Sequence, residues 1–302
     1  MKFAASIVIF LTLFVVPAFG QTCSDSAKEI RPQLLKESEL KMSQDLEIAA
    51  RNYVAEPTAD NAIWYARRKG YLGRYKDAVD ALTIAIKKFP NDARMYRHRG
   101  HRYVTLRCFD DAIRDLEKAA KLIKGKPDEV EPDGQPNEKN IPTSTLQSNI
   151  WYHLGLAYYL KGDFKKAIEA YKECMKVSKN NDMLAATSHW LYMAYRRSQK
   201  PVDAGRLLEP IDGDFEVIEN EDYLKLLRLY RNEVKPEMLL ESLGDKAETL
   251  GNASLGYGLG NWYLYNGDKG RAMGIFRKIV AGNQWASFGY ITAEAEISRL
   301  AK

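Results

Sequence analysis

The chain has 302 residues, of which 45% are hydrophobic and 28% are charged. Its 45 Lys and Arg residues against 40 Asp and Glu residues give a net charge of +5, which is too small to indicate a nucleic-acid-binding protein. This composition excludes whole-chain disorder and a collagen-like structure. Three Cys residues are too few to build a fold from disulfides. The remaining class is a globular protein of two domains or one elongated repeat array.

Residues 1–20 have the pattern of a secretory signal peptide. One basic residue precedes an apolar run over residues 3–19, and the small residues Ala18 and Gly20 lie just before Gln21. We therefore expect cleavage before Gln21 and a periplasmic or secreted bacterial protein, with no transmembrane segment in the mature chain.

Two other interpretations of this region stay open. A membrane anchor is disfavoured by Pro17 and by the small residues at the cleavage site. A lipid-modified Cys23 is the second alternative, and residues 20–22 fit that signal poorly. Cys108 and Cys174 lie in amphipathic segments, so we expect small core residues there rather than a redox pair.

A repeat of large and small residues follows along the chain. One segment shows it most clearly: Trp151-x2-Leu154-Gly155-x2-Tyr158, then Ala167-x3-Tyr171. This pattern resembles the tetratricopeptide repeat, a helix-turn-helix unit of about 34 residues. The second-helix alanine marks the register at Ala78, Ala112, Ala167, Ala204 and Ala272, and Met238 marks a degenerate unit. The packing positions that we expect to hold the helices together are Arg99, Gly100, Ala112, Trp151, Leu154, Gly155 and Ala167.

The resemblance predicts an all-α fold. We expect a right-handed tetratricopeptide solenoid of about six repeats over residues 59–282, with N-terminal capping helices over 21–58 and a C-terminal capping helix over 283–302. The repeats begin near Ala59, Ala93, Ser148, Ala185, Glu219 and Ala253. Helix breaks are expected near Leu72-Gly73, Arg107, Gly162, Gln199–Pro201, Lys235-Pro236 and Gly267. The segment from Arg97 to Tyr103 also resembles an exported bacterial family of such repeats, which implies no particular activity.

An insertion interrupts the 34-residue spacing at residues 125–145. Four of the 11 Pro residues lie in it, and its net charge is −3, so it cannot be helical. It is either a tolerated surface loop or a flap across the groove whose acids pair with nearby arginines. A second acidic stretch, from Glu209 to Asp222, is expected to be a solvated loop. Asp212-Gly213-Asp214 within it is only a weak calcium signal.

Positive charge concentrates in one part of the chain, since residues 61–124 have a net charge of +9. The repeat phase turns one face of each first helix into a concave groove. The candidate groove residues are Arg67, Arg94, Arg97, His101, Tyr152, Tyr159, His189 and Arg196. Arginine pairs well with carboxylates, and tyrosine adds rigid contact area. A solvated charged face is the simpler alternative.

One arginine stands where the repeat expects leucine. Arg99 is at the seventh position of its repeat and should face the second helix, so we expect a carboxylate partner, Asp115 or Asp80.

The resemblance implies a non-enzymatic protein-interaction scaffold. The groove adds an expectation of its own, an acidic peptide or protein partner. The alternative is an enzyme or metal-binding protein that uses groove Arg and His residues, the histidines being His98, His101, His153 and His189. No cofactor, metal or nucleic-acid motif is present, and we expect none of these ligands. The sequence does not indicate the partner or the oligomeric state.

Overall fold

The computed structural model describes residues 22–211, 214–243 and 248–301. The described residues form helices and connecting segments, with one isolated antiparallel bridge between Val130 and Thr145. The predicted signal peptide and the Asp212-Gly213 part of the weak calcium signal lie outside the described residues. Among the described helices, none is both long and apolar enough to cross a bilayer.

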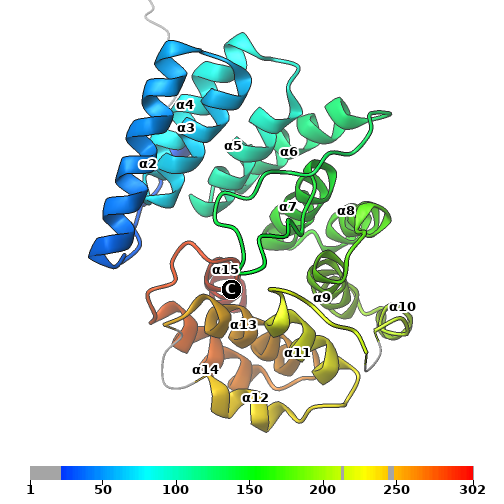
Figure 1. Cartoon of the computed structure of the whole chain (residues 1–302). Coiled ribbons are helices and arrows are strands. Elements are labelled where there is room, and N and C mark those ends of the chain that lie inside the picture. The colour runs from blue at the N-terminus through cyan, green and yellow to red at the C-terminus, as the bar shows by residue number, and fades with distance from the viewer. Residues whose placement is uncertain (1–21, 212–213, 244–247, 302) are drawn as a thin grey trace, which may run out of the picture.

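Six helix pairs follow each other along the chain (Figure 1). Before them lie α1 (Cys23–Ser26) and α2 (Lys36–Ala55), and after them lies α15 (Phe288–Leu300). The first three pairs are α3 (Ala59–Tyr71) with α4 (Tyr75–Lys88), α5 (Ala93–Thr105) with α6 (Phe109–Ile123), and α7 (Leu146–Lys161) with α8 (Phe164–Val177). The last three are α9 (Asn181–Arg197) with α10 (Pro201–Leu207), α11 (Glu221–Tyr230) with α12 (Pro236–Ser242), and α13 (Leu250–Tyr265) with α14 (Lys269–Val280).

The predicted helix breaks are confirmed, and each has a local cause. Gly73, Gly162 and Gly267 adopt positive φ angles, which glycine reaches without the penalty of a Cβ atom. Pro201 and Pro236 begin α10 and α12, where the missing N–H of proline has no intrahelical partner to lose.

The packing positions of the third repeat show why the repeat needs small residues. A Cβ atom on Gly155 would lie 2.7 Å from the Tyr171 ring of the paired helix. Ala167 is fully buried between the two helices and Leu154 is nearly so, while Trp151 is partly buried beside them. The second repeat has the same arrangement, since a Cβ on Gly100 would lie 2.8 Å from Leu116 and Ala112 is fully buried.

The fifth pair departs from the predicted register. Met238, expected at the small buried position, is exposed, and the neighbouring Leu239 is buried instead. The reason is that α12 begins at Pro236 and spans only seven residues, so the regular phase of the repeat is not maintained there.

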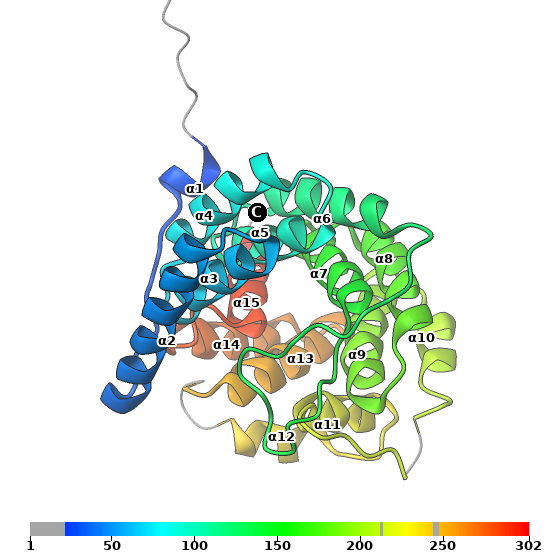
Figure 2. The same cartoon turned by 45° about the horizontal axis from the view of Figure 1, so that its top comes forward.

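The C-terminal helix, predicted as a cap of the solenoid, also contacts an earlier repeat. α15 packs against α13 and α14, and it also contacts α7, so it lies inside the curve of the other helices (Figure 2). Arg107, at the turn before α6, donates to Glu294 at 2.8 Å and to the Trp285 carbonyl at 2.9 Å. Arg299 donates to the Leu160 carbonyl at the end of α7. These contacts join the second and third repeats to the C-terminal segment, and α15 fills much of the concave face.

A buried ion cluster links α15 to α9. Glu296 is fully buried and pairs with Arg197 of α9 at 2.5 Å and with Arg299 of its own helix at 2.6 Å. Both arginines contact the same oxygen, Oε1, while Oε2 has no hydrogen-bond partner among the described residues, so they offset only part of the cost of removing that charge from water.

Candidate functional site

The insertion between α6 and α7 crosses the concave side of the molecule (Figure 1). Its Glu131 is buried and pairs with Arg97 of α5 at 2.9 Å. Arg67 of α3 donates to the Pro132 carbonyl at 2.8 Å, and Asn149 of α7 donates to Glu131 at 3.3 Å. The structure therefore shows the flap arrangement rather than a loop projecting into solvent.

The far end of the insertion reaches the loop before α11 (Figure 2). Asn180 donates to the Thr143 carbonyl at 2.9 Å, and the Thr143 hydroxyl donates to Glu219. That loop is itself held by Asp182, a buried carboxylate that accepts from the backbone N–H groups of Ile218, Glu219 and Asn220. The second acidic stretch is thus ordered at this end and supplies part of the rim of a cleft.

A cleft of about 610 Å³ remains between the insertion and the helices. Six side chains define its character: Arg97 and His101 from α5, Tyr152 and His153 from α7, Tyr223 from α11 and Phe288 from α15. Glu219 and Asp222 also line it. The cleft has aromatic walls, a cation on α5 and two acids at its α11 end. Apolar walls with a few polar groups are typical of ligand-binding sites.

The histidines of the cleft are neutral. The rings of His101 and His153 lie 4.4 Å apart, and His153 Nδ1 lies 2.6 Å from the Asn149 carbonyl, so this nitrogen is the donor. Burial, together with the nearby Arg97, holds the pKa of His153 well below its usual range. Burial and Arg102 do the same for the pKa of His101.

A smaller cavity of about 110 Å³ lies between α3, α5 and the insertion. It shares Arg97 and His101 with the cleft, and Arg67, His98, Arg102 and Glu131 also line it. Arg97 donates to His98 Nδ1 at 3.0 Å, so His98 accepts there and is neutral.

The predicted groove residues separate into three groups. Arg67, Arg97, His101 and Tyr152 line the two cavities, and Arg94 lies nearby, paired with Asp92 and Asp60. Arg97 lies in the predicted groove but is buried, because the insertion covers it. Arg196 lines neither cavity; it donates to Tyr192 and Asn266.

Tyr159 and His189 are corrections, because both are fully buried in the core and neither lines the groove. The Tyr159 hydroxyl accepts from Tyr257 of α13 at 2.9 Å. His189 Nδ1 lies 3.1 Å from the Tyr230 hydroxyl of α11. Both positions point inward as the repeat phase predicts, but helices from later in the chain pack over them.

The expected partner of Arg99 is present. Arg99 makes a two-pronged pair with Asp115 of α6, with distances of 2.6 and 2.8 Å, and also donates to Thr83 at 3.0 Å. This confirms the prediction of a carboxylate partner and selects Asp115 over Asp80.

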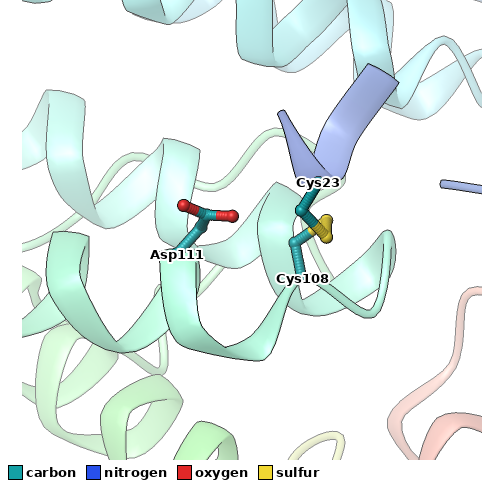
Figure 3. Close-up of side chains that lie close together, drawn as sticks. All are labelled: Cys23, Cys108 and Asp111. Carbon is teal, nitrogen blue, oxygen red and sulfur yellow. A yellow bond between two sulfur atoms is a disulfide. The ribbon is translucent and has the colours of Figure 1, made fainter. Parts of the chain in front are cut away.

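The cysteines overturn one expectation. Cys23 and Cys108 form a disulfide that ties α1 to the start of α6 (Figure 3), so Cys108 is not a free core residue. Cys174 is free and buried, as expected.

Metal ligands do not gather at the histidines in the part of the chain that the structure describes. The one group of three ligand types within 4.8 Å there is Cys23, Cys108 and Asp111, and both sulfurs of that group are in the disulfide (Figure 3). This arrangement does not favour the metal-binding alternative.

Sequence reasoning missed Arg102, Tyr223 and Phe288 as site residues. Tyr223 lies in the degenerate fifth repeat, and Phe288 lies in the expected capping helix. The spacing of the repeat therefore did not predict that either side chain faces the groove. Arg102 belongs to the basic segment on α5, but it lies outside the face of the first helix that the repeat phase turns toward the groove.

Comparison with known proteins finds this repeat in two parts of the chain. Residues 148–181 and 66–129 each match the tetratricopeptide repeat family. Human tetratricopeptide repeat protein 13 is 33% identical over 105 residues, which are 35% of this chain and 10% of that protein. The bovine BBSome complex member BBS4 is 28% identical over 148 residues, which are 49% of this chain and 24% of that protein. The chain therefore spans a quarter or less of the length of these relatives.

Two solved structures resemble the chain at low identity. YrrB, described as a TPR protein with an unusual peptide-binding site, aligns with a TM-score of 0.44 and 13% identity over 84% of this chain and 99% of its own. A tetratricopeptide repeat protein from Parabacteroides merdae aligns with a TM-score of 0.47 and 14% identity over 85% of this chain and 96% of its own. The matched repeats support a protein-interaction scaffold. The chain has six helix pairs, and two of its segments match the repeat family; it is a tetratricopeptide repeat protein.

Proposed function

We propose that this protein is a non-enzymatic, exported scaffold of the bacterial cell envelope that binds an acidic segment of a partner protein in its concave cleft. The observation behind the proposal is the cleft of about 610 Å³, with the cation Arg97 and the neutral His101 on α5 and aromatic side chains along its walls. Its two acids, Glu219 and Asp222, lie at the α11 end. An acidic side chain of the partner would point toward Arg97, and the partner's apolar groups would pack on Tyr152, Tyr223 and Phe288.

The insertion supports this choice of ligand because it already presents an acid to the same arginine. Glu131 pairs with Arg97, and Arg67 binds a backbone carbonyl of the same segment. A partner segment with similar chemistry would compete with the insertion for Arg97. An acidic ligand must therefore bind Arg97 more strongly than Glu131 does, and weak acidic ligands do not displace the insertion.

Export is supported by the disulfide and by the N-terminal sequence. Disulfides form and persist in oxidising compartments such as the periplasm, and Cys23–Cys108 is such a bond. Mass analysis of the purified protein tests this part of the proposal. A mature chain that begins at Gln21 and is two hydrogens lighter than its reduced form supports export, whereas a retained N-terminus contradicts it.

The binding proposal is tested by titrating a labelled library of acidic peptides against wild type and four variants. Glu131→Gln and deletion of residues 127–140 should raise affinity, because both free Arg97 from its internal carboxylate. Arg97→Gln should lower affinity. Added salt should also lower affinity, because charge attraction is screened over about 8 Å at physiological ionic strength. Arg196→Gln is the matched control, since Arg196 lines neither cavity, and it should leave affinity unchanged.

A second blocking variant protects the test against misfolding of Arg97→Gln. Ser254 lines the cleft and is partly exposed, so Ser254→Trp fills the cleft without touching the arginine. Peptide binding that survives in both Ser254→Trp and Arg97→Gln, with helix content unchanged by circular dichroism, would remove the cleft as the binding site.

A further inference from the structure

The small cavity is lined by more cations than acids. Its volume of about 110 Å³ corresponds to roughly three or four water molecules at about 30 Å³ each. Three guanidinium groups line it, from Arg67, Arg97 and Arg102, and the only acid among its lining residues is Glu131. Since His98 and His101 are neutral, the lining has a net charge of +2.

The internal partners of these arginines leave donors unused. Arg67 donates to Tyr71 and to the Pro132 carbonyl, and Arg97 donates to Glu131 and His98. Nevertheless, Arg97 Nε is buried with no hydrogen-bond partner among the described residues, and the Arg97 side chain is only 8% exposed. A buried donor of this kind is costly unless something accepts its proton.

Arg102 has fewer partners than the other two. Within the described part of the chain, its guanidinium is seen in no ion pair or hydrogen bond, and its Cζ atom lies 5.7 Å from the centre of the Tyr75 ring. The residue as a whole is partly exposed. Burial, the largest cause, lowers its pKa to about 10. The protein therefore holds this cation in a place where its charge is disfavoured, and a bound anion would reverse that effect.

The backbone makes room for this arrangement. A Cβ atom on Gly70 of α3 would lie 2.6 Å from Arg102 Nη1, so any other residue there would push the guanidinium away from its position. Gly70 is in the last turn of a helix and has no positive φ to explain it. Glycine at this position leaves space for the observed position of the Arg102 guanidinium.

From these observations we propose that the cavity between α3, α5 and the insertion binds a small tetrahedral oxyanion, phosphate or sulfate, through Arg67, Arg97 and Arg102. A dianion would neutralise the net charge of +2 and accept from Arg97 Nε and from the Arg102 guanidinium. Tyr71, Ala66 and Leu82 complete the lining. This site is separate from the peptide cleft, which shares only its Arg97 and His101 wall.

The test uses the mature protein and inorganic phosphate and sulfate. Binding is measured by titration calorimetry and by the shift in melting temperature, with sodium chloride at matched ionic strength as the reference. Wild type should bind both oxyanions and melt at a higher temperature in their presence than in chloride. Equal melting in all three salts, with no heat of binding, would overturn the proposal.

Two variants locate the site. Arg102→Gln removes the least partnered cation and should weaken binding about tenfold or more, the equivalent of one charge-assisted hydrogen bond. Gly70→Ala leaves all three arginines in place but displaces the Arg102 guanidinium, so it should weaken binding as well. Gly274→Ala in α14 is the matched control, because a Cβ there meets nothing within 4 Å, and its affinity should equal that of wild type.

The variants also separate a binding role from a structural one. Because the charge of the partly buried Arg102 is disfavoured without an anion, Arg102→Gln in chloride should melt at or above the wild-type temperature. Unchanged oxyanion affinity in both Arg102→Gln and Gly70→Ala would place the ion elsewhere and refute the site. Ser254→Trp, which blocks the peptide cleft, should leave phosphate binding intact, so the two proposals can fail independently.

Discussion

Replacing Arg99 by alanine should destabilise the protein by about 3 kcal/mol. The change removes two hydrogen bonds to Asp115 and one to Thr83. It also leaves the Asp115 carboxylate, only 9% exposed, without its cation. Removing one partner of a buried pair costs about 3–5 kcal/mol. The lower end applies here because the Arg99 side chain is 15% exposed and water can reach the vacated space.

The pH dependence of this loss has a definite sign. Burial raises the pKa of Asp115, and the hydrogen bonds from Arg99 offset only part of the increase. Without Arg99 the pKa of Asp115 rises further above its value in the unfolded chain. A carboxyl group with a raised folded-state pKa stabilises the fold below its unfolded pKa and loses that effect as the pH rises. The deficit of Arg99→Ala should therefore be largest at neutral pH and should shrink in acid.

Urea unfolding followed by circular dichroism, at neutral and mildly acidic pH, measures both effects. Arg94→Ala in the same helix is the control, since Arg94 is 34% exposed and its loss should cost at most about 1 kcal/mol. Arg99→Leu should behave like Arg99→Ala, whereas Arg99→Leu with Asp115→Leu should recover most of the stability. An Arg99→Ala protein that unfolds at the wild-type urea concentration would refute the buried pair.

Three further predictions concern the disulfide, the buried Glu296 ion cluster and the low-pKa histidines. Cys23→Ser should lower the free energy of unfolding by about 2–4 kcal/mol, because the disulfide closes a loop between residues 85 apart; treating wild type with a reductant should match the variant in urea unfolding. Glu296→Ala should cost about 3–5 kcal/mol by leaving Arg197 and Arg299 without their carboxylate, and hydrogen exchange should show α15 opening first. Wild type should lose stability as the pH falls below about 6.5, because the histidines bind protons in the unfolded chain but, with their lowered pKa, not in the folded protein. Melting curves from neutral pH to pH 5 check this, and a melting temperature that does not change with pH would contradict it.

Local sequence patterns predicted the helices and their breaks because the causes are local. Gly162 ends α7 by its own positive φ, and Pro201 begins α10. Repeat phase also predicted that Arg99 has a carboxylate partner, Asp115 or Asp80, and the structure shows Asp115 on the paired helix. In each case, the information lies within one repeat.

The surface of the concave face could not be predicted in the same way. Repeat phase turns Arg97, Tyr159 and His189 inward, but whether an inward residue is exposed depends on what fills the curve. Residues 125–145 cover Arg97, and α13 and α11 cover Tyr159 and His189. The disulfide was missed for the same reason: Cys23 and Cys108 are 85 residues apart, and no local pattern pairs them.

Two elements occupy the concave face, and they differ in how firmly they are held. α15 buries Ile291 and Glu296 completely, and its carboxylate holds two arginines. The insertion relies mainly on polar contacts, of which the Glu131–Arg97 pair is buried, and its Val130 and Ile141 side chains stay exposed. Since burial of apolar area is the dominant stabilising term, the insertion should open at a lower free energy than α15. A partner too large for the cleft would therefore displace the insertion first and leave α15 as the floor of the enlarged groove.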